Sequence, residues 1–177
     1  MPSDMPTRPA PEEQTLIILK PDAVARGLVG RILSRFEEKG LRFAAMKLMM
    51  VSEEMARRHY AEHMAKAFFK QLVEFLISAP VLVMVVQGMR AITVCRGMMG
   101  KTFGYDSPPG TIRGDFGMSR SLNLIHGSDS VDAARREIAL FFRPDELIGT
   151  DRELQRWIYG SEDWLMETPQ AGHQDSI

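Results

Sequence analysis

Apolar residues in this chain gather in short continuous runs, separated by stretches in which they recur every three or four positions. The runs at 15–19 and 81–86 predict two strands covered on both faces of a sheet, the second of them central. The stretch 41–51 also predicts a strand, although its two basic residues fall on opposite parity, which indicates a bulge. A short apolar stretch that ends at His126 predicts the fourth strand.

Helical spacing of apolar residues predicts helices between these strands. The first covers about 28–39, and Gly40 just beyond it is a conventional stop signal. Ser52, followed by two glutamates, predicts an N-cap and a helix that continues to about His63. The remaining helices are expected at about 68–78, 91–99 and 131–142, with a short one at 151–157.

The order of these elements predicts one α+β domain with a four-stranded sheet and helices on at least one of its faces. A chain of 177 residues with 45% hydrophobic content is long enough to bury one full core. Residues 1–13, rich in proline, are expected to form a disordered tail, and the polar residues 166–177 a flexible one. The folded domain is therefore expected at 14–165.

Charge and composition argue against several classes of function. A formal net charge of −1 offers no basic surface for nucleic acid, so no nucleic-acid binding is expected. No apolar run approaches the roughly 18 residues of a membrane span. The single cysteine suits a reducing cytoplasm, where we expect the protein to be located. With four scattered histidines it gives no spacing of zinc ligands, so no metal held by the protein alone is expected.

The stretch 123–129 carries the strongest candidate for chemistry. It places His126 at the end of a strand, and a neutral imidazole is a good nucleophile near pH 7 because its lone pair needs no base to free it. Gly127 permits either a close backbone approach or a positive φ. Glu137, two turns into the following helix, is able to reach back and orient the ring. A lone histidine is more often structural, so the residues around it decide.

Side chains suited to phosphate occur in other parts of the chain. Lys20 ends the first predicted strand, and Arg96 faces the solvent edge of a predicted helix. The irregular stretch 101–115 is long enough to indicate a functional loop, and it offers the hydroxyl of Thr102 and the charge of Arg113. The chain has no GxxxxGK[ST] loop and no protein-kinase motifs. Residue types alone therefore predict a phosphate-handling enzyme of another kind.

Four segments of the chain resemble those of nucleoside diphosphate kinases, in the same order and at matching separations. They are 18–22 (Ile-Leu-Lys-Pro-Asp), 26–30 (Arg-Gly-Leu-Val-Gly), 109–116 (Pro-Gly-Thr-Ile-Arg-Gly-Asp-Phe) and 123–130 (Asn-Leu-Ile-His-Gly-Ser-Asp-Ser). The last segment is highly specific to that family, and the resemblance extends over about 13–164. It implies a ferredoxin-like βαββαβ fold, in which helices cover a four-stranded antiparallel sheet.

The resemblance also implies the reaction. The family transfers the γ-phosphate of a nucleoside triphosphate to a nucleoside diphosphate, by a ping-pong mechanism through a phosphohistidine and with broad base and sugar specificity. It implies Mg²⁺ bound mainly through the nucleotide phosphates, and a homo-oligomer that we expect to be a hexamer rather than a tetramer. Broad base specificity has a physical reason, because stacking tolerates any base whereas discrimination needs a hydrogen-bond partner.

Carried over position by position, the family's roles fall on residues that this chain possesses. His126 would be the phosphorylated nucleophile, supported by Glu137 and Ser128. Lys20 would assist catalysis and, with Asn123, hold the sugar hydroxyls. The residues around the phosphates would be Lys20, Tyr60, Arg96, Thr102 and Arg113, with His59 as a weaker candidate, and Phe68 and Leu72 would flank the base.

Several positions depart from the usual family pattern. Lys66-Ala67 stands where an Arg-Pro pair often occurs, and Phe103-Gly104 replaces a common Asn-Pro. Arg120 and Ser121 replace a small or apolar residue and a glycine near the base. None of these changes removes a catalytic group. Proline at Gly104 is expected to stabilise the fold if φ there is near −65° and the N–H is unpaired.

Two other classes of function are compatible with such a fold. Ferredoxin-like sheets also serve RNA-binding domains, but the aromatic RNP1 pattern of those domains is not present in the sequence. A phosphohistidine carrier between proteins would not need Lys20, Thr102, Arg113 and the base-flanking Phe68 together. Nucleotide-dependent labelling of His126 would separate these alternatives from a nucleotide kinase.

Overall fold

The fold is built on a four-stranded antiparallel sheet with the order β2-β3-β1-β4. The computed structural model describes residues 12–149, 155–160 and 162–163. Its strands are β1 (Glu13–Leu19), β2 (Arg42–Met49), β3 (Val81–Gly88) and β4 (Ile125–Gly127). β1 and β3 form the centre, paired from Glu13 opposite Gly88 to Leu19 opposite Leu82. This arrangement confirms the predicted α+β class and the ferredoxin-like strand order.

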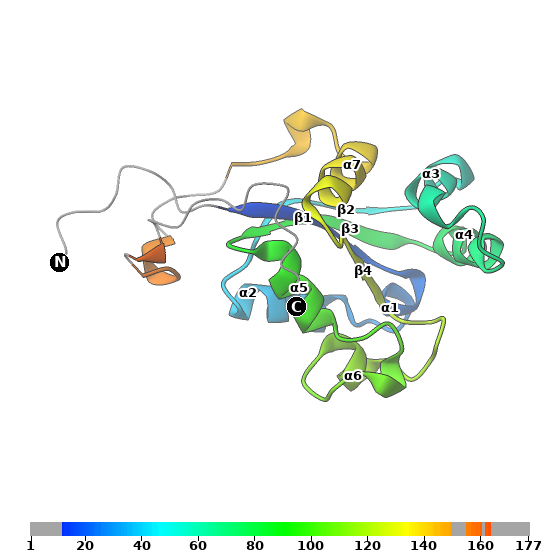
Figure 1. Ribbon diagram of the computed structural model, residues 1–177, viewed down its shortest axis with the longest axis horizontal. Helices are drawn as coiled ribbons and strands as arrows, with labels where there is room; N and C mark the ends of the chain where they lie inside the picture. The colour runs from blue at the N-terminus through cyan, green and yellow to red at the C-terminus, as the bar shows by residue number, and fades with distance from the viewer. Residues whose placement is uncertain (1–11, 150–154, 161, 164–177) are drawn as a thin grey trace.

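Helices cover both faces of the sheet, as Figure 1 shows. On one face lie α3 (Glu53–His59), α4 (Phe69–Ile77) and α7 (Val131–Phe141), and on the other α1 (Pro21–Ala25), α2 (Val29–Glu38), α5 (Ala91–Met99) and α6 (Ile112–Phe116). Short 3-10 turns occur at η1 (Ala61–His63), η2 (Gly104–Asp106), η3 (Pro144–Glu146) and η4 (Gln155–Trp157). Within the described residues no helix is both long enough and apolar enough to cross a bilayer.

The two central strands, β1 and β3, are continuous apolar runs because each contributes side chains to the hydrophobic cores on both faces of the sheet. Leu16 and Ile18 of β1 join the core beneath α3, α4 and α7, while Ile17 and Leu19 join the core on the opposite face. All four side chains are fully buried. Burial of a large aliphatic side chain contributes about 1.5–3 kcal/mol, so this strand anchors the fold from both sides.

Several predicted boundaries are confirmed and others need correction. α5 begins and ends where predicted, and β2 contains the expected irregularity, between Phe43 and Ala45. The helix expected to reach His63 ends at His59, where η1 takes over after Tyr60. Ser52 caps it as predicted, by accepting a hydrogen bond from the Met55 N–H.

Sequence reasoning missed two short helices. α1 begins at Pro21, just after the end of β1, and α6 lies inside the stretch that was expected to be an irregular loop. Each has only five residues, too few to show a helical period or to be stable without tertiary contacts. β1 begins at Glu13, within the predicted tail, while residues 1–11, 150–154 and 166–177 lie outside the described part of the chain. The predicted domain limits therefore stay a prediction.

Candidate active site

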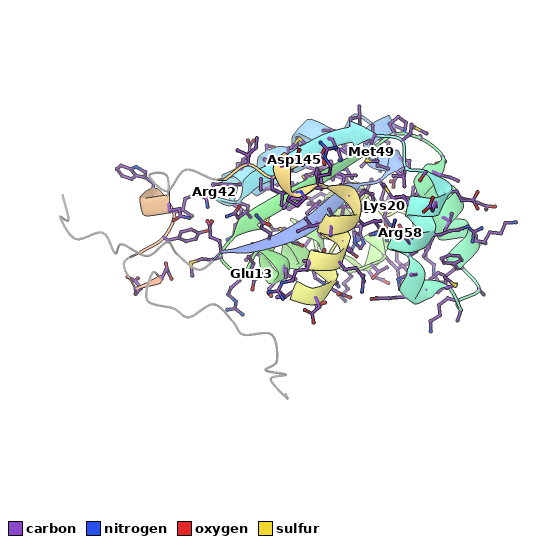
Figure 2. The ribbon with its side chains drawn as sticks, turned by 90° about the horizontal axis from the view of Figure 1, so that it is seen from above. Glu13, Lys20, Arg42, Met49, Arg58 and Asp145 are labelled. Atoms are coloured by element: carbon purple, nitrogen blue, oxygen red, sulfur yellow. The ribbon has the colours of Figure 1, made fainter. Side chains whose placement is uncertain are left out.

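A pocket of about 430 Å³ lies where β1 ends, between the α3–α4 hairpin, α7 and the loops around α6. Figure 2 labels Glu13 and Lys20 at the two ends of β1, and the hairpin lies toward the Lys20 end. The predicted site residues that line this pocket are Lys20, His59, Tyr60, Phe68, Leu72, Arg96, Thr102, Arg113, Asn123, His126 and Glu137. The structure thus brings together segments more than 100 positions apart. A larger groove at the other end of β1 contains none of these residues.

His126 lies in the middle of the three-residue strand β4, opposite Ile18 of β1, and not at a strand end as predicted. Its neighbour Gly127 has an ordinary φ, so the alternative of a positive φ is wrong. A Cβ at Gly127 would lie 2.7 Å from Met99 Sδ and 3.0 Å from Ile17 Cδ1. The glycine therefore permits the close packing of β4 on α5 that fixes the histidine.

Glu137 reaches back from α7 to His126, as predicted. Its Oε2 atom lies 3.0 Å from His126 Nε2 and accepts a hydrogen bond of 2.6 Å from Ser128 Oγ. Ser128 is itself tied to β1, because its N–H donates to the Leu16 carbonyl and its Oγ accepts from the Leu16 N–H. Burial opposes ionisation of Glu137, but the bonds from His126 and Ser128 outweigh it and hold the pKa of Glu137 below its ordinary value.

An ionised Glu137 fixes the tautomer of His126. A carboxylate can only accept hydrogen bonds, so the imidazole proton belongs on Nε2, which faces Glu137. The lone pair of the neutral ring then lies on Nδ1. The His126 side chain is 24% exposed, compared with 7% for Glu137, so the ring is open to the pocket while its partner is shielded.

His59 packs against His126. The two rings meet edge to face with centroids 4.5 Å apart, and His59 Nδ1 lies 4.0 Å from Glu137 Oε1. Burial, together with the proximity of His126, lowers the pKa of His59 to about 3, so this ring is neutral at physiological pH. Its ring nitrogens have no hydrogen-bond partner among the described residues. The structure places His59 beside His126.

Three cations face the histidine from different elements. Lys20 Nζ donates to Asn123 Oδ1 at 2.8 Å, and Arg96 donates to the Gly127 carbonyl at 3.2 Å. Burial lowers the pKa of Lys20 to about 8, assisted by repulsion from Arg113 and opposed by the charge of Asp22. Burial also lowers the pKa of Arg113 to about 10. The pocket therefore concentrates positive charges that repel one another, and a polyanionic ligand would neutralise them.

Arg113 also holds backbone around the pocket. Its guanidinium donates to the carbonyls of Asn123 and Ile125 at 3.0 and 2.6 Å, and to those of Gly100 and Lys101 at 3.1 and 3.2 Å. These bonds join the loop before α6 to the strand that carries the histidine. A lysine could not form such a fork of bonds.

The other end of the pocket is apolar and more open. Phe68 is 48% exposed, and the half-buried Leu72 follows it by one helical turn on α4. Tyr60 is buried, and burial with the nearby charge of Glu137 raises the pKa of its hydroxyl, which stays protonated and able to donate. The exposed Thr102 accepts a hydrogen bond from Asn123 Nδ2 through its carbonyl.

Three charged residues that sequence reasoning did not select also line the pocket: Glu62, Asp129 and Arg136. Glu62 and Arg136 form an ion pair of 2.6 Å between η1 and α7. Asp129 lies in the same segment, 123–129, as His126. That closeness in sequence could have identified it as a residue of the pocket. Neither Glu62 nor Arg136 belongs to a pattern that would have identified it.

The described residues bring one group of potential metal ligands together, namely His59, His126 and Glu137, whose donor atoms lie within 4.8 Å of one another. Two imidazoles and one carboxylate suit transition metals, whereas Mg²⁺ prefers oxygen ligands. Glu62 and Asp129 are exposed carboxylates in the same pocket. They fit a hydrated Mg²⁺ that is already bound to phosphate.

Two of the positions that depart from the expected pattern, Phe103 and Arg120, pack on one another. Phe103 stacks on Tyr105 with centroids 5.9 Å apart, and the Arg120 guanidinium lies 4.9 Å from the Phe103 ring. Gly104 donates its N–H to the Ser119 carbonyl, and a Cβ there would overlap the Gly117 backbone. The unpaired N–H required for a stabilising proline is therefore not present.

Comparisons with known proteins agree with this geometry. A family model described as nucleoside diphosphate kinase matches residues 13–147. The nucleoside diphosphate kinase of Thermomicrobium roseum is 55% identical over 148 residues, which cover 84% of this chain and 99% of that protein. That of Desulforamulus reducens is 49% identical over 147 residues, 83% of this chain and 99% of that protein.

Solved structures give the same result. The chain is similar to a halophilic nucleoside diphosphate kinase from Halobacterium salinarum in complex with CDP, with a TM-score of 0.82, 50% identity and coverage of 84% of this chain and 99% of that one. A nucleoside diphosphate kinase family protein from Babesia bovis gives a TM-score of 0.80 at 44% identity, with coverage of 83% and 99%. The chain therefore belongs to the nucleoside diphosphate kinase family and is an enzyme that transfers phosphate between nucleotides.

Proposed function

We propose that the enzyme transfers the γ-phosphate of a nucleoside triphosphate to a nucleoside diphosphate through a phosphohistidine at His126. The observation that carries this proposal is the contact of Glu137 with Nε2, which leaves the lone pair of a neutral ring on Nδ1 in a pocket lined by Lys20, Arg96 and Arg113. Phosphoryl transfer needs a positioned nucleophile and positive charge around the transferred group, and this arrangement supplies both.

In the first half-reaction, the Nδ1 lone pair attacks the γ-phosphorus and the bond from that phosphorus to the β–γ bridging oxygen breaks. The electron pair leaves with the nucleoside diphosphate, and no proton has to move on the enzyme. Attack by a neutral imidazole leaves a positive charge on the ring, which the carboxylate of Glu137 stabilises. Lys20, Arg96, Arg113 and the hydroxyls of Tyr60 and Thr102 would hold the phosphate oxygens.

The second half-reaction reverses these steps with another nucleoside diphosphate as acceptor. One histidine serves donor and acceptor in turn, which requires ping-pong kinetics. Phe68 and Leu72 would flank the base, while Asn123 and Lys20 would hold the sugar. Stacking on an exposed ring tolerates every base, so we infer broad base specificity.

Mg²⁺ would enter with the nucleotide, bound mainly through its phosphates, and would neutralise charge on them during transfer. Glu62 and Asp129, which line the pocket, would contact its water shell. We further propose that the enzyme acts in the cytoplasm as a homo-oligomer, a hexamer rather than a tetramer. Light scattering at micromolar concentration that showed only a monomer would contradict the assembly.

The test of the mechanism is direct labelling. Incubation with a triphosphate labelled in the γ-phosphate should give a protein phosphate that is acid-labile and alkali-stable, and His126→Gln should not be labelled. Addition of any common nucleoside diphosphate should discharge the label as the triphosphate. Labelling that persists in His126→Gln would contradict the assignment of the nucleophile.

A further inference from the structure

The backbone just before β4 adopts a conformation that its residue does not favour. Leu124 has a φ of +69°, and among the other described non-glycine residues only Arg90 has a positive φ. The Ile125 N–H donates to the Asn123 carbonyl at 2.8 Å, which closes a three-residue γ-turn around Leu124. Such a turn is strained for an L-residue, so the surrounding structure must hold it.

Both peptide groups of Leu124 are held by the segment that follows β1. Its N–H donates to the Oδ2 atom of Asp22 at 3.0 Å, and its carbonyl accepts from the Lys20 N–H at 2.8 Å. The leucine side chain is fully buried in the core that contains α5 and α6. Of the two polar restraints only the Asp22 bond comes from a side chain, so a single substitution can remove it.

Groups on both sides of the turn belong to the active site. Asn123, before it, places its Oδ1 atom 2.8 Å from Lys20 Nζ, and β4, after it, carries His126. Arg113 donates to the two carbonyls that flank the turn, at 3.0 and 2.6 Å. A shift of the turn would therefore displace the nucleophile together with the cations that face it.

Asp22 also brings negative charge to a place where positive charges gather. Its Oδ1 atom is buried and has no hydrogen-bond partner among the described residues. Burial and repulsion from Arg113 lower the pKa of Lys20, whereas the charge of Asp22 raises it. Burial and Arg96 lower the pKa of Arg113, and Asp22 again acts in the opposite sense. The carboxylate thus favours the charged form of both cations.

We propose that Asp22 is a positioning residue for phosphoryl transfer, whose carboxylate holds the Leu124 turn and through it the geometry of Asn123 and His126. The inference rests on the proposed phosphohistidine mechanism. Asp22 does not itself line the pocket, so it acts through the turn and not by contact with the nucleotide. Its loss should slow the chemical step in protein that is still folded.

The test measures the single-turnover rate of His126 phosphorylation in full-length variants, with a γ-labelled triphosphate at saturating concentration. Asp22→Ala removes the acceptor, and we expect a loss of roughly 100-fold, the scale that a misplacement of about 1 Å produces. Asp22→Asn keeps an oxygen that accepts from the Leu124 N–H. It loses only the charge, so its rate should stay within roughly fivefold of wild type.

Asp115→Ala is the matched control. Asp115 also accepts from a backbone N–H in a turn, that of Gly110 at 2.8 Å, and it pairs with Arg35, but it does not line the pocket. Its loss should lower the melting temperature while His126 is phosphorylated at the wild-type rate. If the rate falls by a similar factor in Asp115→Ala and Asp22→Ala, general destabilisation explains the slower phosphorylation in both variants. That result would overturn the proposal.

The outcomes separate this inference from the mechanism on which it rests. A wild-type enzyme that is not labelled overturns the phosphohistidine mechanism. A labelled wild type together with a wild-type rate in Asp22→Ala overturns the role of Asp22 alone. If Asp22→Ala does not fold, Asp22→Ser replaces it, since a hydroxyl one bond shorter does not reach the Leu124 N–H. A wild-type rate in that variant is equally decisive against the proposal.

Discussion

The two ends of the pocket differ in how firmly the protein holds them. At the proposed reaction end, His126 contacts Glu137, and Ser128 ties Glu137 to β1 through buried hydrogen bonds. At the proposed base end, Phe68 is 48% exposed at the start of α4. The ion pair between Glu62 and Arg136, which links this side to α7, is more than half exposed, and such pairs contribute little.

This difference matches the demands of the two ends. Transfer of a phosphoryl group depends on the placement of the nucleophile to within a fraction of an ångström. Stacking of a base on an aromatic ring tolerates sliding and does not depend on which base is present. We therefore expect substitutions of the residues that orient His126 to alter rate constants. Substitutions at the base end should alter nucleotide affinity, and alter it similarly for all bases.

Among the substitutions that compare the two ends of the pocket, the largest effect is expected for Glu137→Gln, which removes the charge that faces the His126 ring. We expect phosphorylation of His126 to slow by roughly 10–100-fold, the usual cost of losing a partner that orients a reactive histidine. Rapid-quench measurement with labelled triphosphate gives the rate, and circular dichroism checks the fold. An unchanged rate would mean that the contact with Nε2 does not matter for the reaction.

Gly104→Pro tests the loop that follows Thr102, a residue of the pocket lining. Proline there would lose the N–H that bonds the Ser119 carbonyl, and its ring would collide with the Gly117 backbone. We expect the free energy of unfolding to fall by roughly 1–3 kcal/mol, the cost of overpacking a close contact. Thermal melts at equal protein concentration measure this, because oligomer stability depends on concentration. A rise in melting temperature would show that the loop can rearrange.

Gly104 shows what the sequence could reveal and what it could not. The sequence showed that the loop departs from its expected pattern, but the contact of Gly104 with Gly117 joins two backbones and has no signature in side-chain chemistry. The strands and most helices were predictable, because β1 and β3 are continuous apolar runs and α5 buries apolar residues at helical spacing. The five-residue helices α1 and α6 were not, since their stability comes from tertiary contacts.

The same distinction applies to the site. The pairing of His126 with Glu137 could be predicted because both lie in one strand–helix unit, where helical geometry determines the reach. The bond between Asp22 and Leu124 joins residues 102 positions apart. It depends on a positive φ at a leucine, which composition and periodicity do not reveal. Pairings across that distance become visible only when the sheet brings β1 beside β4.

Phe68→Ala tests the base end. Removal of an exposed stacking surface should raise KM for the nucleotide by roughly fivefold, the low end of the range for loss of a base–aromatic contact. Because stacking does not read base edges, the increase should be similar for adenine, guanine, cytosine and uracil nucleotides, with little change in kcat. Steady-state kinetics across these four acceptors measure it. A loss confined to one base would show that Phe68 takes part in discrimination.

The smallest expected effect is the pH dependence that Lys20 gives to the reaction end. The pKa of Lys20 is about 8, below its ordinary value, because the side chain is buried. The free enzyme therefore loses this positive charge as the pH rises through 8. KM for a nucleoside diphosphate should increase about fourfold between pH 7 and 8.5, as a single ionisation with that pKa requires. Lys20→Arg, which stays charged, should show a flat profile over the same range.

Stability should change in the opposite direction over the alkaline range, which distinguishes titration of Lys20 from general alkaline damage. In the unfolded chain Lys20 keeps its proton up to its ordinary pKa of 10.5, whereas the folded protein releases it near 8. Between these values the unfolded state binds more protons, so the Lys20 contribution to the free energy of unfolding rises with pH, by up to about 1.4 kcal/mol per unit. Denaturant unfolding at pH 8 and 9.5 measures this in wild type against Lys20→Met, in which the contribution is missing. If nucleotide binding weakens with rising pH while the wild type becomes more stable relative to Lys20→Met, the group that titrates is Lys20. Burial of its charge then destabilises the folded enzyme below pH 8, and the same charge binds the phosphate.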